Sequence, residues 1–124
     1  MSEIINPQDA ELEEIILGSC LIESKAITLI ADILRPEAFY NEKNLEIYAT
    51  LQSMYRNGQK IDIITVKEEL ARRGKLEFIG GPYTLAHISG RVASSAHLEY
   101  HARILKQKYI PVSYTHLRAH ETDS

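Results

Sequence analysis

The stretch DIITVKEELARRG, residues 62–74, shows most clearly what kind of fold the chain adopts. Asp62 stands where the N-cap of a helix is expected, because its short side chain can accept hydrogen bonds from the first free N–H groups. Apolar residues then recur at helical spacing, namely Ile63, Val66 and Leu70. Two arginines and a glycine follow, which is typical of a last helical turn and its end. A β-branched start such as IDIIT could also favour a strand, but a lone strand has no partner.

The same helical spacing of apolar residues continues on both sides of this stretch. We expect a first helix capped at Asn6-Pro7 or Asp9, and then a short helix from Ser24 that ends before Pro36. A single turn at 36–40 should place Phe39 and Tyr40 against the core, and a helix at 44–56 should end at Asn57-Gly58. A helix from Pro82 to Gly90 and a last helix from Ser94 or Ser95 should complete the chain of helices. The predicted fold class is all-α, a small bundle of about five or six short helices.

The bulk composition indicates one ordinary globular domain. The chain has 124 residues, enough for a single compact core. No apolar run is long enough to span a bilayer, and the start lacks the features of a secretory signal. The single cysteine, Cys20, lies among apolar residues and has no internal partner for a disulfide. We therefore expect a cytoplasmic protein in which Cys20 behaves as a small hydrophobic residue.

Charge is divided unevenly along the chain. Residues 1–50 carry a formal charge of −7, whereas residues 51–110 carry +5. One interpretation is that the molecule has two faces of opposite sign, on which sister subunits or a charged partner could meet. The other is that solvated helices simply differ in sign. The basic half is too mild to be a DNA-binding footprint by itself.

Residue patterns that carry chemistry are missing from the sequence. Gly74-Lys75 does not complete a phosphate-binding loop, because no suitable glycine or strand precedes it. No serine, histidine and aspartate are placed as a triad. His97 and His101 are four apart, but two ligands do not hold zinc and no third is suitably spaced. We expect no catalytic, cofactor-binding or metal-binding residues in this chain.

The end of the chain differs from the rest. HLRAHE, residues 116–121, places His116, His120 and Glu121 as in a zinc hydrolase helix. However, Pro111 interrupts the preceding helix, and VSYTHLRAHET resembles a translated transposon-end sequencing adaptor, codon by codon. We therefore expect residues 111–124 to be a non-native, flexible tail and residues 1–110 to be the domain.

Five spaced elements of the sequence point to a family. In order, they are Leu17-Gly18 after an acidic first helix; Phe39-Tyr40; Asp62 with Thr65 and Val66; Arg73-Gly74-Lys75-Leu76 followed by Gly80-Gly81; and Tyr100 with Arg103 and Ile104. Together they resemble the N-terminal domain of DnaB-like bacterial replicative DNA helicases, over about residues 7–110. One departure is Asn44, where many members of the family carry histidine.

The resemblance implies an all-helical head whose last helix is the first arm of a helical hairpin, here truncated. In the family this domain forms a collar on a hexameric ring, contacts neighbouring protomers and receives the primase and, in some species, a loader. ATP, magnesium and single-stranded DNA would belong to a separate motor domain, which is missing from this chain. The fragment itself would then catalyse nothing.

The last predicted helix is where contacts with other subunits or partners are expected. The residues of this possible face are Tyr100, Ile104, Leu105, Lys108 and Tyr109. Because the second hairpin arm is missing, we expect Ile104, Leu105 and Tyr109 to be more exposed than apolar residues usually are.

Two other functions remain open from the sequence. A helix-turn-helix DNA-binding protein also has short helices separated by glycine, although Arg72, Arg73 and Lys75 sit at a helix end rather than along a recognition helix. The helicase-binding domain of a primase resembles the collar in fold, although the order of the five elements fits the helicase better.

Overall fold

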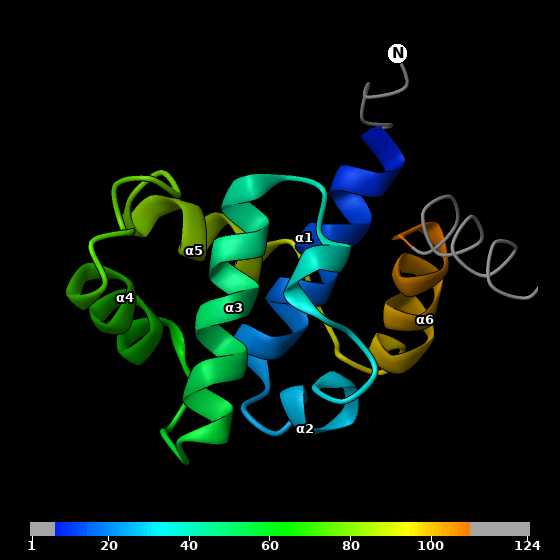
Figure 1. Ribbon diagram of the computed structural model, residues 1–124, viewed down its shortest axis with the longest axis horizontal. Helices are drawn as coiled ribbons and strands as arrows, with labels where there is room; N and C mark the ends of the chain where they lie inside the picture. Colours follow the sequence, from blue (N-terminus) through cyan, green and yellow to red (C-terminus); the bar gives the residue numbers. More distant parts are fainter. Residues whose placement is uncertain (1–6, 110–124) are drawn as a thin grey trace, which may run out of the picture.

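Six α-helices and one 3-10 turn follow one another in residues 7–109, the part of the chain that the computed structural model describes (Figure 1). The elements are α1 (Pro7–Ile22), α2 (Ile27–Ile30), η1 (Pro36–Ala38), α3 (Glu42–Arg56), α4 (Ile63–Arg72), α5 (Pro82–Gly90) and α6 (Leu98–Tyr109). Every regular element in this range is helical, which confirms the predicted all-α class.

Helix α1 lies at the centre of the bundle and packs against α3, α5 and α6 (Figure 1). Ile16, Leu17 and Cys20 are completely buried, because neighbours surround this helix on most sides. The approach of α5 is especially close at Gly18. A Cβ atom added there would lie 2.6 Å from the carbonyl oxygen of Ile88, so only glycine fits without a shift. The Leu17-Gly18 step is therefore a packing requirement.

Helix α3 begins two residues earlier than the sequence predicts. The side chain of Asn41 accepts hydrogen bonds from the backbone N–H groups of Lys43, at 2.8 Å, and Asn44, at 3.2 Å. Asn41 is thus the N-cap, and Glu42 is the first helical residue. The predicted end is confirmed, since Asn57 is the C-cap and Gly58 adopts a φ of +73°, which favours glycine.

Helix α4 confirms the prediction made from residues 62–74. The carboxylate of Asp62 accepts from the backbone N–H of Thr65 at 2.8 Å, and the Thr65 hydroxyl accepts from the Asp62 N–H at 2.9 Å. This reciprocal pair is a capping box. Val66 and Leu70 are buried, and Gly74, with a φ of +74°, follows the helix.

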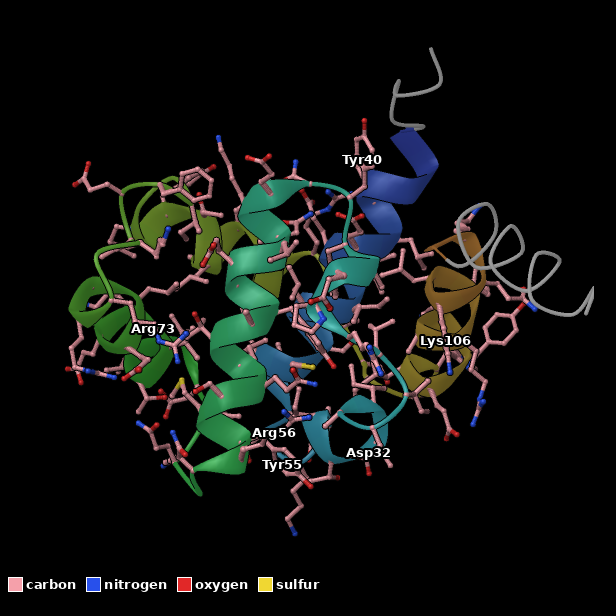
Figure 2. The ribbon with its side chains drawn as sticks, in the orientation of Figure 1. Asp32, Tyr40, Tyr55, Arg56, Arg73 and Lys106 are labelled. Atoms are coloured by element: carbon pink, nitrogen blue, oxygen red, sulfur yellow. The ribbon has the colours of Figure 1, made fainter. Side chains whose placement is uncertain are left out.

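The segment between α1 and α3 contains less helix than expected. The predicted helix from Ser24 is limited to α2 (Ile27–Ile30), and η1 makes the turn before α3. Phe39 packs in the core against Tyr48, with 4.9 Å between ring centroids. Tyr40, however, is 56% exposed, so its expected place against the core is wrong. Its backbone N–H donates to buried Glu13 at 2.6 Å, while Figure 2 shows its side chain projecting outward.

Candidate assembly and docking surfaces

Helix α6 is buried along one side only. Leu98, Ala102 and Leu105 form the buried stripe, and the helix packs against α1, α2 and η1. Leu105 is 2% exposed, so the prediction that it lacks cover is wrong. The reason is that α1, α2 and η1 close over this side within a single chain, without a second hairpin arm.

The opposite side of α6 carries the other predicted contact residues. Tyr100, Ile104 and Lys108 are spaced four apart and therefore line up along one stripe. Tyr100 is 64% exposed, Ile104 is half-buried and Lys108 is exposed. Tyr109 ends the helix, and the prediction about its side chain lies outside the described residues. The five predicted residues thus do not share one face, because Leu105 points into the core.

Polar groups of α6, and His97 just before it, lie beside this outer stripe. Arg103 donates to Glu99 at 2.9 Å, an exposed pair four residues apart that contributes little stability. The rings of His97 and His101 are 6.4 Å apart. Burial, followed by the charge of His97, lowers the pKa of His101 below its usual value. Lys106 extends from the same helix into solvent (Figure 2).

Opposite charges from the two halves of the chain pair with one another at the surface of the molecule. Arg91, after α5, donates to Glu11 of α1 at 3.0 Å and also to Glu14. Lys75, after α4, lies 3.8 Å from Glu46 of α3. Part of the uneven charge of the sequence is therefore paired between helices of the same chain, and such exposed pairs contribute little stability.

A buried carboxylate, Glu13, is the polar centre of α1. Glu13 is fully buried and accepts from the backbone N–H groups of Tyr40, at 2.6 Å, and Asn41, at 3.3 Å. The side-chain amide of Asn44 donates to it at 2.9 Å. Asn44 thus holds a buried acceptor, which gives this departure from the family pattern a structural role.

The arginines at the end of α4 are occupied by an acid of the same helix. Arg72 and Arg73 both donate to Glu69, each through its Nε at 3.1 Å. Hydrogen bonds from Arg72 and then Arg73 lower the pKa of Glu69 to about 2. These guanidinium groups are committed to a carboxylate, which weakens the interpretation of this helix end as a DNA contact.

Cys20 is buried in α1, and desolvation raises the pKa of its thiol to about 12. A thiol that stays protonated is a poor nucleophile, so Cys20 acts in packing. Within residues 7–109, no three His, Cys, Asp or Glu side chains come together as a metal site would need. The tail histidines and Glu121 lie outside the described residues.

Among the described residues, none of the helices α1 to α6 is both long enough and apolar enough to cross a bilayer.

The sequence matches the family model of the DnaB-like helicase N-terminal domain over residues 5–107. The chain belongs to this family. It is 42% identical over 106 residues to the replicative DNA helicase DnaB of Rhodothermus marinus, covering 86% of this chain and 11% of that protein. It is 33% identical to the replicative DNA helicase DnaC of Bacillus subtilis (strain 168), covering 89% of this chain and 25% of that protein.

The fold agrees with a solved member of the family. The crystal structure of the N-terminal domain of DnaB helicase from Mycobacterium tuberculosis superimposes with a TM-score of 0.76 at 33% identity. The match covers 81% of this chain and 72% of that one. The chain spans only about a tenth to a quarter of the length of the two helicases above.

Proposed function

We propose that this chain is the N-terminal assembly and docking domain of a hexameric replicative DNA helicase that acts in the cytoplasm. The observation that supports it most is the family match, which takes in nearly the whole described domain. The names of the relatives, replicative DNA helicases, point to the same process. Sister protomers, a primase and in some species a loader are the proposed partners.

The proposed work of this domain is binding. The outer stripe of α6, formed by Tyr100, Ile104 and Lys108, combines an exposed ring, an aliphatic side chain and a cation. Aromatic and aliphatic groups with a polar edge are typical of protein interfaces. ATP and magnesium would be held by a separate motor domain, which would also pull single-stranded DNA, and we assign no residue of this chain to them.

The two alternative functions have less support. The relatives are helicases rather than primases, which disfavours the helicase-binding domain of a primase. For a helix-turn-helix protein, free cations would be needed on an exposed helix, but Arg72 and Arg73 are held by Glu69. Tight binding to duplex DNA with a steep salt dependence would favour that alternative instead.

The gene offers the first test. Sequenced in its proper frame beyond codon 110, it should encode the second hairpin arm, a linker and a motor domain with a G-x-x-x-x-G-K-[ST] loop. An open reading frame without a phosphate-binding loop would contradict the proposal. The adaptor-like residues 111–124 should be absent from that gene.

Assembly of the complete protein is the second test. Sedimentation should show a hexamer, and Tyr100→Ala should weaken it because an exposed ring would be lost from the contact stripe. Tyr55→Ala, which removes a partly exposed ring from α3, is the matched control and should leave the hexamer unchanged. Equal effects of both variants would argue against the α6 stripe.

A further inference from the structure

The two histidines at the start of α6 are one helical turn apart. The backbone N–H of His101 donates to the carbonyl of His97 at 3.0 Å, so the helical hydrogen-bond pattern already includes His97. Side chains four residues apart in a helix lie on the same face. His97 is exposed and His101 is half-buried, so the pair is open to solvent along one side.

The two imidazole rings are close enough to share one ligand. Their centroids are 6.4 Å apart, and their planes are inclined by 79°. A transition-metal ion such as zinc binds an imidazole nitrogen at about 2.0–2.1 Å. Two such bonds, together with the radius of each ring, span about the observed separation. An ion therefore fits between the rings after a small rotation of the side chains.

The ring nitrogens of this pair are available as ligands. Among residues 7–109, neither imidazole makes a hydrogen bond or an ion pair, and the rings contact only each other and, for His101, Tyr100. Glu99 and Arg103, the charged residues on the same turns, pair with one another and add no net charge. Burial lowers the pKa of His101, which favours the neutral form of the ring that binds metals.

The number of ligands determines which ion the pair suits. No third His, Cys, Asp or Glu among the described residues joins it, so a zinc ion held by four protein ligands is excluded there. Copper(II) binds nitrogen ligands more tightly than the other first-row divalent ions do, and it accepts a tetragonal set of nitrogen and oxygen ligands. Water can complete such a set, because one side of the pair is open to solvent.

We propose that His97 and His101 chelate one divalent transition-metal ion, copper(II) most tightly, with water as the remaining ligands. This revises the expectation, drawn from the sequence, that the pair binds no metal, and it goes beyond the proposed function. A bound ion would tie together the first turn of α6. It would also place positive charge near Tyr100, whose ring centroid lies 5.8 Å from that of His101.

A lone histidine provides the comparison within the same chain. His87 lies on α5, and its ring neighbour is Tyr83, at 5.9 Å between centroids. A single imidazole gains nothing from chelation, in which the second ligand binds from the same molecule at a high effective concentration. The pair should therefore bind copper(II) at least about tenfold more tightly than His87 does.

The experiment is a calorimetric titration of the full chain with copper(II) chloride, followed by electron paramagnetic resonance of the bound ion. The chain carries His116→Gln and His120→Gln, which remove the other two histidines spaced four apart. The expected result is one tightly bound ion per chain, with coupling to the nitrogens of two imidazoles. In this background, His97→Gln should weaken binding at least about tenfold and leave coupling to one imidazole.

Two further variants are the controls. Ala96→His combined with His97→Gln keeps the number of histidines but moves one off the face of His101, so it should bind as weakly as His97→Gln. His87→Gln should bind as tightly as the background chain. Circular dichroism should show that all variants keep their helices.

Three results would overturn the proposal. They are equal binding by His97→Gln and the background chain, coupling to fewer than two imidazoles in the background chain, and loss of the tight site in His87→Gln. Each would show an adventitious ion only. Sedimentation of the complete protein tests the proposed function independently of all three.

Discussion

Helices α1 and α6 are in contact with one another but differ in how much of their surface is buried. Helix α1 is enclosed by α3, α5 and α6, and even a carboxylate, Glu13, and a glycine, Gly18, have fixed partners there. Helix α6 buries a single stripe and leaves the other side to solvent. The comparison teaches that α1 determines the fold, whereas α6 has room to serve contacts outside the domain.

The largest expected effect compares a buried leucine from each helix. Leu17→Ala should lower the free energy of unfolding by about 4 kcal/mol, because the enclosed site cannot collapse around the cavity. Leu105→Ala should cost about 2 kcal/mol, because its helix can shift toward the cavity. Urea unfolding followed by circular dichroism measures both. Equal losses would remove the distinction between the helices.

Carboxylates give the second comparison. Glu13→Ala should cost about 3 kcal/mol, since it leaves the buried side chain of Asn44 and the N–H of Tyr40 without their acceptor. Glu99→Gln on α6 breaks only an exposed pair with Arg103 and should leave stability unchanged. The same unfolding experiment tests both. A stable Glu13→Ala variant would show that the buried network is not needed.

Glycines sharpen the comparison at the α1–α5 contact. Gly18→Ala should cost about 2 kcal/mol, because the new methyl group would press on the Ile88 carbonyl and on Val92. Gly90→Ala is the matched control, since nothing lies within 4 Å of a Cβ at Gly90 and its φ is not positive. That variant should be neutral or slightly stabilising. The thermal unfolding midpoints of the two variants measure this difference. A lower midpoint for Gly90→Ala than for Gly18→Ala would contradict the prediction.

The smallest expected effect is a pH dependence that originates in α6. Folding lowers the pKa of His101, so the unfolded chain takes up its proton first as the pH falls below about 6.5, and stability decreases. The free energy of unfolding should therefore decrease less between about pH 8 and about pH 5 for His101→Gln than for the unchanged chain. His97→Gln should also reduce the loss, since the charge of His97 contributes to the shift. If the free energy of unfolding decreased by the same amount in all three proteins, the pH dependence would not originate in His101.

Local signals made most of the fold predictable. The capping box at Asp62 and the stop at Gly58 depend on residues close in sequence, and both are confirmed. The buried state of Glu13 could not be predicted, because its partners are 27 to 31 residues away. Tyr40 was misplaced for the same reason, since the long-range bond to Glu13 decides which way its backbone turns.

The candidate contact surfaces were less predictable than the fold. Helical spacing already separates Leu105 from Tyr100 and Ile104, and it could have corrected the expected contact face. The hollow lined by Tyr40, Asn41 and Phe78 could not be found this way, because it joins the start of α3 to the loop after α4. Such a surface depends on packing that no single stretch of sequence encodes.

The clasp of Arg91 onto Glu11 and Glu14 sits where the chain leaves α5 on its way to α6. It ties the segment that follows α5 to the acidic side of α1. Dissolved ions loosen exposed clasps of this sort. Raising the ionic strength should therefore weaken this link between α1 and the segment after α5.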